Sequence, residues 1–265
     1  MNIFDIHVHI FPDAIAEKAS RATGRFYGLD MEYDGKLSTA IAALDDAGIR
    51  RFAAHSVAST PHQAESINRF VLESHKAYPD RLIPFAAMHP AQEHVADFAD
   101  GIVNAGFYGV KLHPDIQNFQ LDSPAAMELF AALEGRLPVI IHTGDVRYDN
   151  SGPVRMRRVL DAFPRLTCIC AHLGGYSEWD DALRLLADTN CYVDTSSALF
   201  ALPPERAREI IRSYGADRVL FGTDYPMWNM KRELGRFLSL ELTDAENERI
   251  LHRNAEELLH LPAVD

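Results

Sequence analysis

Short apolar runs alternate along the chain with longer segments in which apolar residues recur every three or four positions. Runs such as 82–88 (LIPFAAM) and 166–172 (LTCICAH) are typical of buried strands. Segments such as 61–78 have the spacing of an amphipathic helix with one buried face. Proline or glycine stands at most junctions between the two kinds of segment. The pattern therefore predicts eight strands, most of them followed by a helix.

The predicted strands occupy residues 4–10, 51–57, 82–88, 107–113, 137–142, 166–172, 191–195 and 218–221. The predicted helices occupy residues 37–47, 61–78, 91–105, 124–133, 153–163, 177–188 and 203–214, and one or two further helices close the chain at about 231–261. Residues 11–33 are predicted to be irregular, because Gly24 and Gly28 interrupt them. This segment is either a place for substrate contacts or a plain surface excursion.

Strands that alternate with helices imply a parallel sheet, and eight such units are the content of a closed (β/α)8 barrel, the TIM barrel. No linker, low-complexity run or shift in composition divides the chain, so residues 1–265 are expected to form a single α/β barrel domain. An open doubly wound sheet is the alternative. Such a sheet carries a glycine-rich phosphate-binding turn after its first strand, and residues 7–12 (HVHIFP) are not one.

Composition and charge narrow the class of protein. Hydrophobic residues make up 47% of the chain and charged residues 24%, which is ordinary for a globular protein. The net charge of −12 argues against a nucleic acid or an anionic membrane as partner. No apolar run approaches the ~20 residues of a membrane span, and the N-terminal residues lack the positive region of a signal peptide. The expected partner is a small molecule.

The chain has three cysteines, and we expect all of them to be reduced thiols. Cys168 and Cys170 lie two apart on a predicted strand, where side chains run parallel and do not readily bridge. Buried apolar filler is favoured over a metal-binding pair for these two residues. Reduced thiols and the lack of a signal peptide together predict a cytoplasmic location.

The first predicted strand carries the clearest chemistry. If it alternates strictly, Asp5, His7 and His9 share one face, and its apolar residues share the other. The two histidines are then roughly 6.6 Å apart along the backbone, so that both imidazoles can reach one metal ion. Two ordinary histidines on a polar strand face are an equally good explanation of this motif alone.

Other predicted strands end in residues of the same kind. In a barrel, the carboxyl ends of all strands share one rim, and active sites lie there. These residues therefore converge on one mouth, and packing does not explain so many of them. They are Lys111 and His113 at the fourth strand, His142 at the fifth, His172 at the sixth and Asp224 at the eighth. His55 and His89 end the second and third strands, and we assign neither a catalytic role.

Some residues at this rim keep more than one interpretation. His113 either faces the site or caps the chain before Pro114, and Asp224 could also cap the next helix. Asp145 and Tyr148 directly follow the fifth strand, and we expect them, with Lys111 and His113, to contact substrate.

Five short motifs, in this order, resemble the amidohydrolase superfamily, and most closely its amidohydrolase-related branch, which includes aminocarboxymuconate-semialdehyde decarboxylase. They are HVH (7–9), GVKLHP (109–114), IHTG (141–144), AHLGG (171–175) and FGTDYP (221–226). Each motif is short, but their order and spacing extend over almost the whole chain. The resemblance implies a (β/α)8 barrel of the metallo-dependent hydrolase type, and it implies that two copies pair as a homodimer.

The resemblance also implies roles for individual residues. His7, His9, His142 and Asp224 would bind a metal ion, and His172 would polarise the substrate or orient the attacking water. Asp224 would also act as general base. Such a donor set suits Zn²⁺ best, with Mn²⁺ or Fe²⁺ as alternatives, and one ion is favoured over two. Lys111 could be carboxylated and bridge two ions, bind a substrate carboxylate, or pair with an acid.

Three functions are compatible with these residues. The first is a metal-dependent hydrolase that acts with an activated water on a C–N or C–O bond of a small carboxylated substrate. The second is a metal-dependent, non-oxidative decarboxylase of an aromatic or unsaturated acid, in which protonated Asp224 or His172 delivers a proton to carbon. The third is a non-catalytic metal-binding barrel, which predicts missing ligands, and none is missing. The first is preferred.

Overall fold

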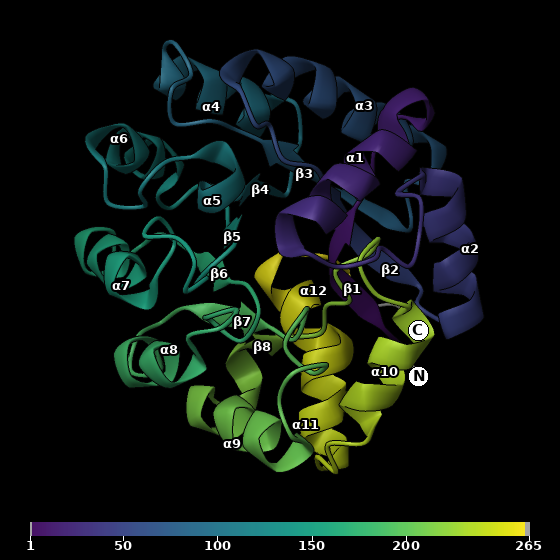
Figure 1. Ribbon diagram of the computed structural model, residues 1–265. Helices are drawn as coiled ribbons and strands as arrows, with labels where there is room; N and C mark the ends of the chain where they lie inside the picture. Colours follow the sequence, from purple (N-terminus) through teal and green to yellow (C-terminus); the bar gives the residue numbers. More distant parts are fainter. Residues whose placement is uncertain (1, 263–265) are drawn as a thin grey trace.

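The computed structural model describes residues 2–262, and its core is one sheet of eight parallel strands in chain order. The strands are β1 (Phe4–His9), β2 (Arg51–His55), β3 (Leu82–Ala87), β4 (Gly109–Leu112), β5 (Val139–Ile141), β6 (Cys168–Cys170), β7 (Tyr192–Asp194) and β8 (Val219–Leu220). The sheet curves round so that β1 and β8 become neighbours (Figure 1). The predicted (β/α)8 barrel is confirmed.

Helices surround the strands (Figure 1). They are α1 (Asp13–Tyr27), α2 (Leu37–Ala47), α3 (Ala64–Ala77), α4 (Val95–Asn104), α5 (Pro114–Gln117), α6 (Pro124–Leu133), α7 (Pro153–Ala162), α8 (Trp179–Leu186), α9 (Pro204–Tyr214), α10 (Met230–Leu238), α11 (Asp244–Glu248) and α12 (Asn254–Leu258). Short 3-10 segments, η1 (Pro61–Gln63) and η2 (Ala216–Arg218), and a π segment, η3 (Arg249–Arg253), complete the described part. All seven helices predicted before residue 215 are present.

Two apolar layers stabilise the barrel. The larger lies between the strands and the helices, and it contains both Cys168 and Cys170 as buried free thiols, as expected. The smaller fills the inside of the barrel with side chains such as Phe4, Phe85 and Ile140. The Phe85 ring occupies the space that a side chain on Gly109 would need, which explains the glycine in β4. The floor beneath the strand ends is therefore solid.

The strict alternation predicted for the first strand is wrong at one point. Ile6 packs inside the barrel with Phe4, whereas Val8 and Ile10 pack outward against the helices. The pairing of β1 with β2 shifts between Asp5 and Val8, and such an irregularity breaks the two-residue period. The side chains of residues before and after the shift therefore do not follow one alternation.

The prediction of an irregular segment at 11–33 is also wrong, because residues 13–27 form the helix α1. Its buried face consists of Ala16, Ser20 and Gly24, spaced four residues apart. None of these has a large apolar side chain, so the hydrophobic pattern cannot reveal the helix. Gly24 is needed because a Cβ there would lie 2.6 Å from the Leu29 carbonyl oxygen.

Within residues 2–262, the helices are all too short or too polar to cross a membrane.

Candidate metal centre

The seam that closes the barrel brings the first predicted metal ligands together. The Ile6 N–H donates to the Phe221 carbonyl (2.9 Å), the Asp224 N–H to the His7 carbonyl (2.9 Å) and the His9 N–H to the Tyr225 carbonyl (2.8 Å). The chain after β8 thus continues alongside β1 like a further stretch of strand. This backbone pairing sets His7 and His9 directly beside Asp224.

Three donor atoms from these residues form a small triangle. His7 Nε2 lies 3.3 Å from His9 Nε2 and 3.5 Å from Asp224 Oδ1, and His9 Nε2 lies 3.6 Å from Asp224 Oδ1. Donor atoms around a tetrahedral ion with bonds of about 2.0 to 2.1 Å are about 3.3 Å apart. The spacing and chemistry of these three donors therefore fit a divalent metal ion, and they could hold one.

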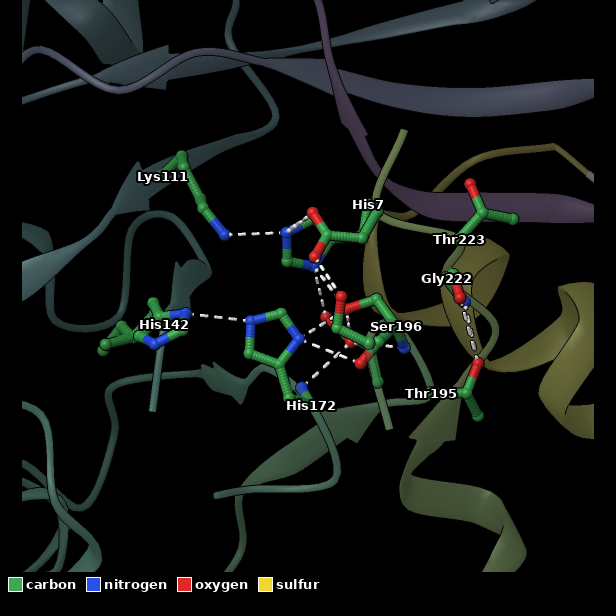
Figure 2. Close-up of polar contacts among 12 residues, drawn as sticks. His7, Lys111, His142, His172, Thr195, Ser196, Gly222 and Thr223 are labelled. Atoms are coloured by element: carbon green, nitrogen blue, oxygen red, sulfur yellow. Dashed lines mark hydrogen bonds and ion pairs between the residues drawn. The ribbon is translucent and has the colours of Figure 1, made fainter. Parts of the chain in front are cut away.

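A second layer of polar groups orients the donors. His7 Nδ1 lies 2.9 Å from Asp194 Oδ2 and 2.9 Å from Ser196 Oγ, so the proton sits on Nδ1 and Nε2 presents its lone pair to the site. Figure 2 shows Ser196 on this side of the His7 ring and Lys111 on the other. The Ser197 hydroxyl donates to Asp224 Oδ2 at 2.5 Å, which leaves Oδ1 facing the histidines.

His172 and His142 form a chain of imidazoles beside this triangle (Figure 2). His172 Nδ1 lies 2.9 Å from the Ser196 carbonyl oxygen, so it carries the proton. His172 Nε2 is then an acceptor for His142 Nδ1–H, at 2.9 Å. This arrangement leaves His142 Nε2 without a hydrogen bond, 3.5 Å from an oxygen of Asp115.

The structure therefore joins three of the four predicted ligands directly, but not the fourth. His142 reaches the triangle only through His172, and its free nitrogen belongs to a different group of donors, with His113 and Asp115. The assignment of His142 as a ligand of the same ion stays a prediction.

Lys111 and His113 both lie where the sequence placed them, at the base of the site. Lys111 Nζ is buried 3.0 Å from His7 Nε2, and among residues 2–262 no carboxylate forms an ion pair with it. His113 both faces the site and caps the chain before Pro114, and substrate contact by it stays a prediction. Its Nδ1 accepts from the Ile116 N–H at the start of α5, and its Nε2 lies 2.7 Å from the hydroxyl of Tyr27 in α1.

Asp145 and Tyr148 lie one layer further out and do not line the cavity. Both carboxylate oxygens of Asp145 accept from the guanidinium of Arg147, at 2.6 to 3.2 Å. Arg147 also donates to the Phe26 carbonyl of α1 (2.9 Å), and the Tyr148 ring stacks on that of Phe26. The contacts seen for these residues hold the C-terminal end of α1, and substrate contact by them stays a prediction.

Burial sets the protonation of the site. It holds the pKa of the imidazoles of His7 and His9 well below the ordinary value, which keeps them neutral and able to bind a metal at pH 7. Burial also lowers the pKa of Lys111 to about 8 and that of His172 to about 4, and raises the pKa of Asp224 to about 6.

Backbone strain also occurs in the site. His172, Ser197 and Asp224 all have positive φ angles, of 62°, 46° and 61°. Residues other than glycine rarely adopt this left-handed conformation, which costs of order 1 kcal/mol or more each. Such strain is typical of functional sites, where the surrounding structure holds a side chain in one position. Asp224 does not cap the following helix, because Asn229 caps α10.

The site lies at the base of a cavity of about 340 Å³. Its polar base consists of His7, His9, Lys111, His113, His142, His172 and Asp224, and its walls are mostly apolar. α1 forms one wall with a single helical face, residues Ile15, Ala19, Ala22, Thr23 and Tyr27. Among the described residues, Lys111 is the only lysine or arginine that lines this cavity.

Sequence reasoning missed the polar residues that support the site, namely Asp194, Ser196 and Ser197. Asp194 ends β7, and Ser196 and Ser197 come directly after it, in the run Asp194 to Ser197 (DTSS). The rule that polar strand ends meet at one rim therefore applies here too.

A family model described as amidohydrolase matches residues 4–261. The chain belongs to the amidohydrolase family. It is therefore an enzyme of this metal-dependent family, and the resemblance in its motifs is confirmed.

Several proteins of known structure are similar to this chain and share the barrel. An uncharacterised TIM-barrel protein from Bordetella bronchiseptica is 26% identical over 98% of this chain and 99% of its own, with a TM-score of 0.78. A dihydroxybenzoic acid decarboxylase from Polaromonas, with bound manganese and an inhibitor, is 18% identical over 100% and 98% (TM-score 0.75). A probable 2-pyrone-4,6-dicarboxylic acid hydrolase from Acinetobacter baumannii is 19% identical over 98% and 100% (TM-score 0.70). None of the curated proteins matches this chain.

Proposed function

We propose that this amidohydrolase is a zinc-dependent hydrolase that cleaves a C–N or C–O bond of a small substrate with one carboxylate. The observation that carries the proposal is the triangle of His7 Nε2, His9 Nε2 and Asp224 Oδ1, with all sides at or below 3.6 Å, at the base of a cavity. Two imidazoles and a carboxylate favour Zn²⁺ over harder ions. One ion per chain is proposed.

The residues around the triangle have separate tasks. When bound, a divalent ion supplies Lewis acidity, which polarises a carbonyl and lets water release a proton near neutral pH. Asp224 is placed to take that proton as general base and to pass it to the leaving group. The carboxylate is held for this task by Ser197. His172, fixed through Nδ1 by the Ser196 carbonyl, orients the substrate or the water from the other side.

The cavity supports a substrate with one anionic end and an apolar body. Lys111 is the only cationic side chain among the described lining residues, and it lies beside His7. A carboxylate therefore binds at the polar base, next to the reacting bond. The described lining residues include no second cationic side chain, and the walls from α1, Val57, Ile67, Ile116 and Met227 are mostly apolar, so they favour an apolar body over a second carboxylate.

Non-oxidative decarboxylation is the second candidate, and the same placement of Lys111 favours it. A carboxylate held at the polar base is itself the group that such a reaction removes. The solved relatives include both a dihydroxybenzoic acid decarboxylase and a probable dicarboxylic acid hydrolase. Asp224 or His172 would then protonate the carbon that loses carbon dioxide.

The test is an assay of the protein loaded separately with Zn²⁺ and Mn²⁺. Carboxylated lactones and amides report hydrolysis, and hydroxylated benzoic acids report release of carbon dioxide. We expect turnover of the first group only with metal, and a loss of about 100-fold or more in His172→Asn, which keeps its metal. Carbon dioxide release alone would establish the second candidate. No turnover of either group by fully loaded protein would contradict both.

A further inference from the structure

The last residue of α1 brings a phenol to the polar base of the cavity. Tyr27 lines this cavity, and its hydroxyl oxygen lies 2.7 Å from His113 Nε2 and 3.4 Å from His142 Nδ1. Two more residues hold the ring, since the Arg147 guanidinium carbon lies 5.4 Å from its centroid and the centroid of the Tyr176 ring lies 5.3 Å from it. The hydroxyl group is therefore held in one place by its surroundings.

The neighbouring histidines determine the direction of these hydrogen bonds. His113 Nδ1 accepts from the Ile116 N–H at 3.3 Å, so the proton of this imidazole is on Nε2, which donates to the Tyr27 oxygen. Nδ1 of His142 also carries a proton, because it donates to His172 Nε2. Neither histidine can therefore accept the proton of the Tyr27 hydroxyl group.

The other hydroxyl groups of the cavity differ from Tyr27 in this respect. Among the described residues, five hydroxyl groups line the cavity, and four of them donate to oxygens of the protein. These are Thr23 to the Ala19 carbonyl (3.2 Å), Ser56 to the Ile10 carbonyl, Ser59 to Gln63 Oε1 (2.9 Å) and Ser66 to the Gln63 carbonyl (2.9 Å). The fifth is Tyr27, whose proton has no acceptor among residues 2–262. A fixed donor without a partner at the surface of a cavity is a site for an acceptor atom of a ligand.

We propose that Tyr27 is a substrate-binding residue, whose hydroxyl group donates a hydrogen bond to a carbonyl oxygen of the substrate outside its carboxylate. The inference rests on the proposed function, in which Lys111 binds the carboxylate, and it adds a second point of recognition. An amide, an ester or a lactone supplies such a carbonyl. Because the N–H of His113 polarises the hydroxyl group, this hydrogen bond strengthens as negative charge develops on the carbonyl oxygen.

The same geometry disfavours other groups at this position. A methylene group would leave the hydroxyl proton of Tyr27 unpaired, which costs free energy once water is displaced. An ammonium or an amide N–H would face a hydroxyl group whose oxygen already accepts from His113. Tyr27 therefore favours substrates that have a carbonyl a few bonds away from the carboxylate.

The test measures by calorimetry how much one ligand oxygen adds to binding by Zn²⁺-loaded protein. The probes are 4-oxopentanoate, 5-oxohexanoate and 6-oxoheptanoate, each compared with the parent acid that lacks the ketone, so that the oxygen lies at three different distances from the carboxylate. In wild-type protein, at least one oxo acid should bind about fivefold more tightly than its parent. Tyr27→Phe should abolish this difference. The control Tyr176→Phe removes a hydroxyl group from a ring beside the same His142, outside the cavity lining, and should retain the difference.

A difference that persists in Tyr27→Phe, or that is absent from all three pairs in wild-type protein, would overturn the inference. The tautomer of His113 provides a second readout, which needs no ligand. ¹⁵N NMR of the imidazole should find its proton on Nε2, whereas a proton on Nδ1 would reverse the hydrogen bond to Tyr27 and overturn the inference. Failure of every acid to bind, parents included, would instead contradict the proposed carboxylate site at Lys111, and the tautomer would then decide whether Tyr27 is a free donor.

Discussion

At the residue scale, the site depends on ligand side chains that are held in one orientation by hydrogen bonds to other residues. His7 is oriented through Asp194 and Ser196, and Asp224 through Ser197. Each contact excludes an arrangement that does not suit metal binding, namely the wrong tautomer of the histidine or the wrong orientation of the carboxylate. Outer contacts of this kind contribute to metal affinity although they do not touch the ion.

Ser197 allows this contribution to be separated from backbone strain. Ser197→Ala and Ser197→Gly both remove the hydroxyl that holds Asp224, so both should bind Zn²⁺ about 10- to 100-fold more weakly. Only the glycine relieves the φ angle of 46°, so the metal-free glycine variant should be more stable than the alanine variant by about 1 kcal/mol. Chelator competition and urea unfolding measure the two effects. Equal stability of the variants would contradict the assignment of strain.

At the element scale, the structure differs from the sequence pattern where small or polar residues form a buried face. A helix with large apolar residues on its buried face, such as α6 with Leu129, Phe130 and Leu133, occupies its predicted range. α1 was not predictable in this way, because its buried face is Ala16, Ser20 and Gly24. The role of this helix depends on tertiary structure, since it forms a wall of the cavity.

The wall formed by α1 should control the length of an apolar ligand. Ala19 lines the cavity, whereas Ala14 is exposed on the same helix and does not. In Zn²⁺-loaded protein, Ala19→Leu should weaken binding of octanohydroxamate about tenfold, because it displaces one or two methylene groups. Binding of acetohydroxamate should not change, and Ala14→Leu should affect neither compound. Calorimetry gives the affinities, and equal losses for both compounds in Ala19→Leu would rule out this role.

A capping box at α11 gives the barrel a pH-dependent contribution to stability far from the site. The Thr243 hydroxyl accepts from the Glu246 N–H, and Glu246 accepts from the Thr243 N–H and from Arg212. The hydrogen bond from Arg212 is the main cause that lowers the pKa of Glu246 from 4.5 to about 2. This stabilisation is complete above pH 4.5 and is lost as the pH falls towards 2.

Glu246→Gln should therefore lower the free energy of unfolding at pH 7 by about 1 kcal/mol. The difference from wild-type protein should shrink steadily below pH 4.5, since wild-type Glu246 then becomes neutral as well. Glu128→Gln, on the exposed side of α6, is the control and should show no such trend. Urea unfolding between pH 7 and 3 measures the free energy of unfolding of each protein. A difference between wild-type protein and Glu246→Gln that grows towards low pH would contradict this prediction.

At the scale of the whole molecule, parallel strands explain why so much of the site was predictable. Eight parallel strands around one barrel put every strand's carboxyl end at the same rim. The polar residues at the carboxyl ends of β1, β4, β5, β6 and β8 could therefore be assigned to one site from the sequence alone, and apart from Asp145 and Tyr148 they line one cavity.

Contacts across the barrel were not predictable. The shifted pairing of β1, the exact partners of His142 and the contact of His55 with the β1 histidines depend on how far strands slide and side chains turn. The alternation of polar and apolar residues along a strand indicates neither the register between strands nor the side-chain torsions. The expected location, the homodimer and the carboxylate contact of Lys111 stay predictions for a different reason, since they depend on surroundings, partners and ligands outside the chain.

The central claim is that the triangle at the β1–β8 seam holds one metal ion, and elemental analysis tests it most directly. Wild-type protein, purified without chelator and then given Zn²⁺, should contain about one ion per chain. His7→Ala/His9→Ala should contain almost none yet remain folded, because both residues lie at the rim above a solid apolar floor. His62→Ala, exposed after β2, is the control. A stoichiometric ion in the double variant, or none in the wild-type protein, would contradict the account.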